Sequence, residues 1–290
     1  MTTDQDEHPW QDWVGRTMEC SDLVTPAPLA ALAALLDSED GNPASGFEAP
    51  PLSHWLCFAP MARQSELGED GHPRRSDFLP PITLPRRIWA AGRLTFHKPI
   101  RVDDEIRRVS RIQAVAQKRG RSGDLAFVTV RHEVSSSEGL YISEEQDIVY
   151  KETSSNDASG LTPQPERAPD DEQFSRTIFP DPVLLFRYSA VTSNGHRIHY
   201  DRSYAAQVGG YPGLVVHGSL IATLLLDLMR RECPEARVRR FDFKAVSPLF
   251  DSQPFSVCGR WESDQQVALW ARNPERPLHV ACVAQAKPTS

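Results

Sequence analysis

Hydrophobic and polar residues nearly alternate in several stretches of the chain, which are rich in β-branched and aromatic residues and separated by turn signals. These strand-like stretches are 86–115, 124–135, 140–152, 238–262, 266–273 and 278–288. The first three and the last three form two groups, and the sequence features within the two groups follow the same order. Each group opens with a strand, a proline-marked bend, and an Asp before a further apolar strand. The pattern therefore predicts two similar sets of antiparallel strands.

Segments with a helical hydrophobic pattern precede each set of strands. The strongest, 219–233, is apolar on all sides and stops before Pro234, so we expect a helix that is buried on most sides. In the first half the counterparts are 27–38 and 51–67, the latter disturbed by Pro60. A long buried helix followed by antiparallel strands, repeated twice, predicts an α+β fold, the tandem (double) hotdog. A doubly wound α/β sheet would need strands that alternate with helices throughout.

The chain divides at a segment rich in Ser, Pro, Gly and Asp. This segment, 153–173, reads as an exposed linker between an N-terminal hotdog at 1–152 and a C-terminal one at 174–290. A second such stretch, 68–81, reads as a long loop inside the first half.

Composition narrows the class of protein. The 290 residues are 40% hydrophobic and 24% charged, which is typical of a soluble globular protein. The net charge of −7 argues against nucleic acid as a partner. No apolar run approaches the roughly 18 residues of a membrane span, and the acidic N-terminus does not resemble a signal peptide. Five scattered cysteines suit reduced thiols, so we expect a cytoplasmic location.

One short stretch, RYSAVTSNGHRIHYD at 187–201, gathers candidate chemistry just after a strand-like run. Asn194, His196 and His199 lie within it, and histidine is the side chain that titrates nearest to physiological pH. An isolated H-x-x-H is more often an ordinary turn or surface feature. No phosphate-cradling glycine motif and no C-x-x-C pair is present. The rest of the sequence is therefore needed to tell whether this cluster is catalytic or only part of a surface turn.

Two motifs of the second half, RYSAVTSNGHRIHYDRSYA and GYPGLVVHGSLIATLLLDLM, resemble the MaoC-like double-hotdog hydratases. Within them the chain is most similar to the branch of the hydroxyacyl-thioester dehydratases type 2 and the mesaconyl-/itaconyl-CoA hydratases. LPRRIWAAGRLTFHKPIRVDD resembles their N-terminal dehydratase domain, here degenerate. The resemblance implies a hydro-lyase that adds water to an α,β-unsaturated acyl thioester, or removes it, with catalysis in the second half.

The typical family motif is an Asp, an Asn two residues on, and a catalytic His. In this chain the His falls at His199, but Asn194 takes the place of the Asp and His196 that of the Asn. An amide orients water but carries no proton. We therefore expect His199 to act as base and acid, with Asn194 positioning the water. Backbone amides at Gly218, where the buried helix starts, are expected to bind the thioester oxygen.

Substrate-binding candidates surround this set, each with a plainer structural explanation. They are His196, His217, Tyr188, Arg197 and Arg87. Tyrosines here are more often core or pocket wall, and each arginine, including Arg86, Arg187 and Arg202, is individually more often a solvated charge. Asp201 is expected to cap the short helix RSYAAQ. We expect no metal, and no cofactor other than the coenzyme A of the substrate.

The resemblance suggests a short branched dicarboxylyl-CoA, itaconyl-CoA or mesaconyl-CoA, with citramalyl-CoA as product. The alternatives are a 3-hydroxyacyl-thioester dehydratase of fatty-acid type, a hotdog thioesterase, and a non-catalytic acyl-binding protein. Because a double hotdog already mimics a pair of single ones, both a monomer and a homodimer fit the sequence.

Overall fold

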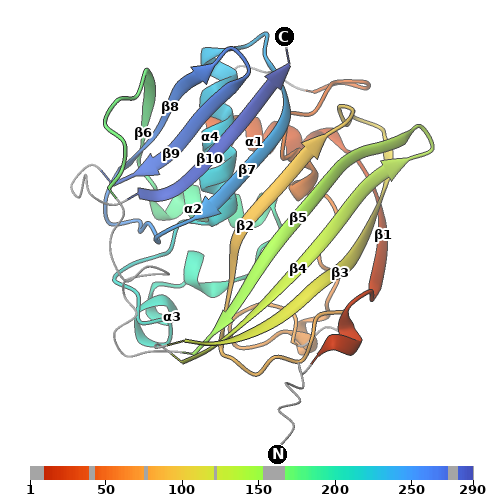
Figure 1. The fold of residues 1–290 in the computed structure, drawn as a ribbon, viewed down its shortest axis with the longest axis vertical. Helices are drawn as coiled ribbons and strands as arrows, with labels where there is room; N and C mark the ends of the chain where they lie inside the picture. Colours follow the sequence, from red (N-terminus) through yellow and green to blue (C-terminus); the bar gives the residue numbers. More distant parts are fainter. Residues whose placement is uncertain are drawn as a thin grey trace, which may run out of the picture.

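The computed structural model describes residues 10–38, 43–74, 78–120, 123–152, 167–273 and 280–289. Within these ranges ten strands form one continuous antiparallel sheet (Figure 1). The strands are β1 (Thr17–Leu23), β2 (Arg86–Phe96), β3 (Glu105–Gly120), β4 (Gly123–Ser136), β5 (Gly139–Lys151), β6 (Phe174–Ile178), β7 (Arg237–Ala245), β8 (Phe255–Ser263), β9 (Gln266–Arg272) and β10 (Val280–Thr289).

The sheet consists of two halves with the same internal order. The first half runs β1-β3-β4-β5-β2, and the second, read from the opposite edge, runs β6-β8-β9-β10-β7. The halves join where β2 pairs with β7, with Ala91 opposite Lys244 and Thr95 opposite Arg240. The repeat and the double-hotdog fold predicted from the sequence are confirmed. The edge strands β1 and β6 were not predicted, because they are short and largely polar.

Two helices contribute to the hydrophobic core of the protein. The helix α4 (Gly218–Glu232) crosses the face of β8, β9 and β10 and is buried along most of its length, as its uniformly apolar sequence predicts. The shorter helix α1 (Pro26–Leu36) begins with a proline in its first turn and buries Leu29 and Leu32. Both helices belong to one hydrophobic cluster that also includes Leu94 and Phe241 at the junction of the halves.

The prediction of a helix at 51–67 is wrong. The segment forms only two 3₁₀ turns, η2 (Ser53–Leu56) and η3 (Gln64–Glu66), with extended chain around Pro60. A proline removes a helical hydrogen bond and disfavours helical geometry in the residue before it, so the apolar pattern of this segment does not become a helix. A third short turn, η1 (Gln11–Trp13), precedes β1.

His54 of η2 belongs to a buried polar network around Glu144 of β5. Its Nε2 lies 3.0 Å from Glu144 Oε2, and Trp55 Nε1 donates to the other oxygen of the same carboxylate. Gln146 also donates to Glu144, and His132 lies opposite it on β4. Burial raises the pKa of Glu144, but the hydrogen bond and charge of His54 outweigh it and lower that pKa to about 2. The carboxylate is therefore ionised and paired inside the first half.

Most of the predicted linker lies outside the described residues, since only 167–173 of it is described. All five cysteines are free thiols. No described helix combines the length and apolar character needed to cross a membrane.

Candidate active site

His199 lies at the end of a 3₁₀ turn, η5 (Arg197–His199), and is only 7% exposed. Its Nδ1 lies 2.7 Å from the carbonyl oxygen of Val215. A carbonyl only accepts hydrogen bonds, so Nδ1 carries the hydrogen and Nε2 keeps a free lone pair. Burial lowers the pKa of His199 to about 4, partly opposed by the bond to Val215. The ring is therefore neutral near pH 7 and presents a base at Nε2.

The start of α4 lies beside this imidazole. The extended segment before the helix pairs through Val215 with Phe250, and His217 stands at the N-cap position of the helix, where its side chain makes no capping bond to the backbone amides. The ring of His217 stacks on that of His199 with centroids 3.6 Å apart and 18° between the planes. The first amides of a helix lack backbone partners and lie at the positive end of its dipole. His199 and these amides are therefore neighbours.

Gly218, the first residue of α4, has free space on its side-chain side. A Cβ added there would meet no atom within 4 Å, and the residue is exposed although His217 and Leu220 beside it are buried. His217 adds an unusual feature, because its buried Nδ1 has no hydrogen-bond partner in the described part of the chain. A buried polar atom without a partner is costly, so both observations favour a ligand at this place.

Asn194 is held in the turn that follows α2 (Pro182–Val191). The strand-like run expected before it is wrong: Asp181 caps a helix there by accepting from the Leu184 amide, and a proline opens it. Ser193 then adopts the left-handed region at φ 51°, which turns the chain. Asn194 Oδ1 accepts from the His196 amide at 3.0 Å. Its carbonyl oxygen is thus used locally, and the side-chain NH₂ is the group left for water.

Four imidazoles form a row that crosses both halves. The centroid separations are 4.4 Å from His72 to His196, 5.5 Å from His196 to His199, and 3.6 Å from His199 to His217. Burial is the main reason that the pKa of His196 falls to about 3 and that of His217 falls well below its ordinary value. The sequence pointed to three of these histidines and missed His72, which comes from the first half.

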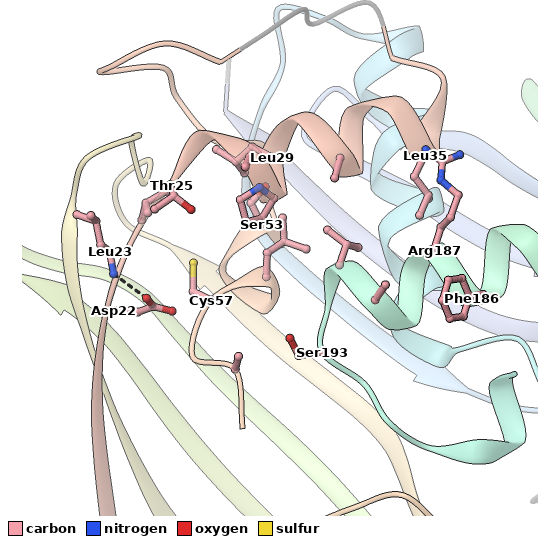
Figure 2. A pocket seen from close by; sticks show the side chains of 18 residues that line it. Asp22, Leu23, Thr25, Leu29, Leu35, Ser53, Cys57, Phe186, Arg187 and Ser193 are labelled. Carbon is pink, nitrogen blue, oxygen red and sulfur yellow. Dashed lines mark hydrogen bonds between the residues drawn. The ribbon is translucent and has the colours of Figure 1, made fainter. Parts of the chain in front are cut away.

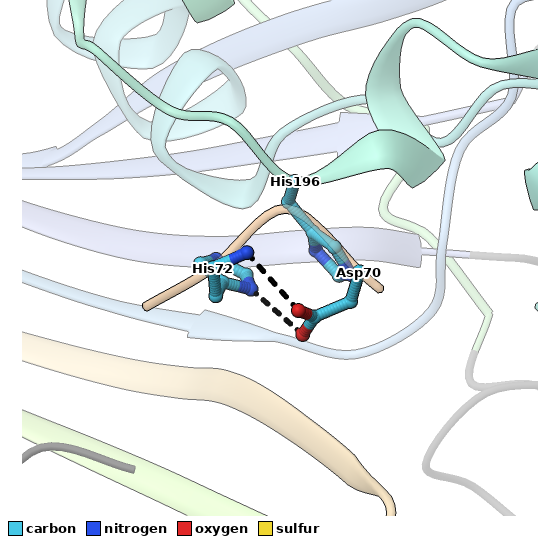
Figure 3. A group of neighbouring side chains, drawn as sticks. All are labelled: Asp70, His72 and His196. Atoms are coloured by element: carbon cyan, nitrogen blue, oxygen red, sulfur yellow. Dashed lines mark hydrogen bonds and ion pairs between the residues drawn. The ribbon is translucent and has the colours of Figure 1, made fainter. Parts of the chain in front are cut away.

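Asp70 and His72 belong to the segment predicted only as a long loop. Asp70 Oδ1 accepts from the His72 amide at 3.0 Å, and Oδ2 lies 3.1 Å from His72 Nδ1 (Figure 3). The signal that could have found them is the D-G-H triplet, since an Asp that bonds the backbone two residues on is typical of a fixed turn. A fixed turn that carries an imidazole is a stronger candidate than a plain loop.

This loop is seated on the turn that carries the candidate residues. The Arg197 amide donates to the carbonyl of Asp70 at 2.9 Å, and Arg197 Nη1 donates to that of Glu69 at 3.0 Å. Gly71, at φ +88°, packs so closely that a Cβ there would lie 2.0 Å from the Gly195 oxygen. Only glycine fits this position. The first half therefore contributes directly to the site in the second.

The other candidate residues have varied surroundings. Tyr188 is buried, with its hydroxyl 3.3 Å from Thr223 Oγ1 and its ring edge-on to His217, as a pocket wall would be. Arg197 is also paired with Asp201, so its part in substrate binding stays a prediction. Asp201 caps α3 (Arg202–Gln207), as expected. Arg87 is exposed on β2, its charge contributes to lowering the pKa of His196, and its part in substrate binding stays a prediction.

The other three candidate arginines are Arg86, Arg187 and Arg202, and two of them are bonded to other parts of the protein. Arg86 donates to the carbonyl of Gly209, and Arg202 pairs with Asp251. Arg187 instead lines a cavity of about 690 Å³ between the halves (Figure 2). Its walls come from β1, α1 and η2 in the first half and from α2 in the second, ending at Ser193 beside Asn194. Ser193, the residue before Asn194 in the chain, is where the lining of this cavity comes nearest in sequence to the candidate residues.

Comparisons with known sequences show the family of the chain. The family model of the hydroxyacyl-thioester dehydratases type 2 matches residues 52–251, which include His72, Asn194, His199 and Gly218. A mesaconyl-C(4)-CoA hydratase of Chloroflexus aurantiacus is 46% identical over 267 residues, which cover 92% of this chain and 94% of the relative. A mitochondrial hydroxyacyl-thioester dehydratase type 2 of Schizosaccharomyces pombe is 29% identical, over 72% of this chain and 76% of its own.

Solved structures share the fold. A MaoC-like dehydratase from Phytophthora capsici superposes with a TM-score of 0.71 at 14% identity, over 97% of this chain and 98% of its own. HtdX of Mycobacterium tuberculosis has a TM-score of 0.66 at 21% identity, over 94% of this chain and 100% of its own. At such identities these likenesses show the fold alone.

Proposed function

The chain belongs to the family of the hydroxyacyl-thioester dehydratases type 2, and from that premise we propose that it adds water reversibly to mesaconyl-C4-CoA, giving citramalyl-CoA. The protein is a hydro-lyase of CoA thioesters, as its relatives are. The hydratase at 46% identity supports the substrate, because it matches nearly the whole of both chains. Itaconyl-CoA, also named by the sequence resemblance, is the nearest variant of this substrate.

The proton chemistry needs a single neutral base. Nε2 of His199 takes a proton from water while the water oxygen bonds to Cβ, and the electrons of the double bond move toward the thioester oxygen. The imidazolium then returns its proton to Cα, so the ring ends as it began and water has been added across the bond. The side-chain amide of Asn194 does not act as an acid or a base, but its NH₂ can donate a hydrogen bond to the water oxygen.

The thioester oxygen gains negative charge in this step and needs donors already in place. Gly218 supplies them, because its amide and the next ones lie at the start of α4 and no side chain occupies the space in front of them. The free Nδ1 of His217 supports a ligand in the same place. The cavity that ends at Ser193 is our proposed path for the pantetheine arm or acyl group.

The single observation that carries the proposal is the stacking of His199 on the residue that precedes Gly218. The test is an assay of purified protein with mesaconyl-C4-CoA and crotonyl-CoA, following loss of the absorbance of the conjugated thioester, and with itaconyl-CoA, whose double bond is not conjugated with the thioester, following the product by chromatography. We expect the fastest turnover with mesaconyl-C4-CoA and no release of free thiol. Release of free coenzyme A would identify a thioesterase, and the absence of any product from all three would favour an acyl-binding protein.

A second candidate function is dehydration of longer 3-hydroxyacyl thioesters. The match to the hydroxyacyl-thioester dehydratase type 2 of Schizosaccharomyces pombe favours it, as does the apolar wall that Val24, Leu29 and Leu35 give to the cavity. Activity that rises steadily with acyl length from crotonyl- to octenoyl-CoA would support this candidate over the dicarboxylyl one.

Water addition involves no net oxidation or reduction, so we propose that no cofactor beyond the coenzyme A of the substrate takes part. We place the enzyme in the cytoplasm, where its five free thiols would stay reduced. The homodimer stays a prediction, which the molar mass measured by light scattering would test.

A further inference from the structure

The proposed substrate carries a second negative charge close to the reacting carbon. In mesaconyl-C4-CoA the free carboxylate and a methyl group are both attached to Cβ, the atom that water attacks. This carboxylate must therefore enter the site beside the imidazole that activates the water. A carboxylate removed from water needs donors or positive charge around it, and His199 itself is committed to the proton.

The ring of His196 lies next to that of His199, and the ring of His72 lies next to that of His196. Neither His196 nor His72 has a role in the proton transfer above, and both are partly buried. Asp70 holds Nδ1 of His72, which leaves Nε2 as the nitrogen available to a ligand. The backbone bonds of Arg197 and the close contact of Gly71 fix this imidazole on the site. An imidazole fixed in this way is preorganised to bind a ligand.

One permanent cation and several imidazoles would meet an anion here. His196 and His199 are neutral near pH 7, so among the groups that affect the pKa of His196 the permanent positive charge is that of Arg87, and Asp70 carries the opposing negative charge. Both oxygens of Asp70 are already engaged by His72. An added carboxylate would favour the protonated form of a neighbouring imidazole, which then donates a hydrogen bond to it.

We propose that His72 and His196, with Asp70 orienting His72, form the subsite for the carboxylate on Cβ, so that the first half selects dicarboxylyl thioesters for the second. This inference rests on the proposed function and names the residues that select its substrate. The same three side chains offer ligand atoms that all lie within 4.8 Å of one another, a spacing that a metal ion could also use. Both oxygens of Asp70 are already engaged by His72, which favours a carboxylate that orients this imidazole over one that binds a metal.

The test compares two unreactive thioesters of the same shape. Methylsuccinyl-C4-CoA carries the carboxylate, and isovaleryl-CoA has a methyl group in its place. For His72→Gln we expect the Kd of methylsuccinyl-C4-CoA, measured by calorimetry, to rise about 10- to 100-fold, the usual effect of losing a bond to a charged group, with less than about a threefold change for isovaleryl-CoA. Asp70→Asn should change the same ratio in the same direction, by less. His97→Gln, an exposed histidine bonded to Ser143 on the first half, is the matched control and should leave the ratio unchanged.

Equal losses for both thioesters in His72→Gln and in Asp70→Asn would overturn the subsite and leave only a structural role. Loss of hydration activity on treatment with EDTA, with recovery on adding Zn²⁺, would overturn it in favour of a metal. A wild-type protein that binds methylsuccinyl-C4-CoA more tightly than isovaleryl-CoA yet hydrates neither mesaconyl-C4-CoA nor crotonyl-CoA would refute the proposed function while retaining the subsite. Equal binding of the two by the wild type would refute the subsite alone.

Discussion

His199 and His217 stack face to face, with ring centroids 3.6 Å apart and 18° between their planes. One ring ends the turn η5, and the other immediately precedes α4, so the contact fixes the distance between the proposed base and the start of the helix. Each ring is also anchored on its other side, His199 by the carbonyl of Val215 and His217 by the hydroxyl of Ser189 at 2.8 Å. Preorganisation of this kind is what stabilisation of a developing charge requires, because no reorganisation is needed during the reaction.

Replacement of the base should abolish most of the activity without unfolding the protein. For His199→Gln we expect kcat to fall by at least about 100-fold, since general acid–base catalysis contributes about 10²–10⁴-fold. The amide can still donate toward Val215, so the melting temperature should change little. Steady-state rates with mesaconyl-C4-CoA and a thermal melt check this together. Retention of more than about a tenth of wild-type kcat/KM would contradict the assignment.

The acid limb of the pH profile should lie unusually low. The base works when neutral, and the pKa of His199 is lowered to about 4, chiefly by burial. We therefore expect kcat/KM to stay level as the pH falls through 6.5 and to decline only near pH 4, provided that the fold is still intact. Rates in mixed buffers from pH 4 to 8, with circular dichroism at each point, provide the measurement. A decline centred between pH 6 and 7 would point to a different base.

A methyl group at the start of α4 should separate activity from stability. Gly218→Ala places its Cβ in open space, and alanine is a better helix former than glycine, so the free energy of unfolding should stay equal or rise by up to about 1 kcal/mol. The same methyl would occupy the place where the thioester oxygen approaches the amides. We expect kcat to fall at least about tenfold, the size of effect that loss of one such donor produces or exceeds. Unchanged kcat would mean that the thioester lies elsewhere.

The repeated strands and the helix α4 could be predicted because their signals are local. Period-two alternation and a uniformly apolar run of helical length depend on burial alone, and both elements are buried. The helix α2 was mistaken for a strand although Asp181 and Pro182 signal a helix start, because its short run of β-branched and aromatic residues was given more weight. The segment 51–67 was mistaken for a helix because its apolar residues were read as a helical pattern. In the structure these residues form 3₁₀ turns interrupted by proline.

Two residues of the candidate site could not be predicted from local sequence patterns. Asn194, His199 and Gly218 stand within or next to recognisable motifs, but Asp70 and His72 reach them only through the folding of the first half onto the second. That approach depends on glycine contacts and on the bonds of Arg197 to backbone carbonyls far along the chain. Such contacts leave no periodicity in the sequence, so only coordinates bring these residues together.

The buried pair of His54 and Glu144 should govern acid stability. The pKa of Glu144 is lowered to about 2, against a value of 4.5 before folding, so its contribution is fully present above pH 4.5 and is lost as the pH falls toward 2. Glu144→Gln breaks the pair and should destabilise the protein by about 3–5 kcal/mol at pH 7, with less pH dependence between 4.5 and 2. Urea unfolding at several pH values measures both effects. Equal stability of variant and wild type at pH 7 would show that the pair contributes nothing.

The cavity between the halves provides the last test. Ala190 lies on α2, lines this cavity and is exposed, so a larger side chain there meets space rather than packed core. If the pantetheine arm or acyl group runs through the cavity, Ala190→Trp should raise the KM of every CoA thioester at least about tenfold and leave the melting temperature within a few degrees. Because Ala190 does not contact the proton-transferring ring, kcat at saturation should fall less than KM rises, which is the mark of lost binding in the ground state. Val183→Trp, on the same helix at an exposed position outside the cavity lining, is the matched control and should change neither constant. An unchanged KM in Ala190→Trp would place the substrate on another route to His199.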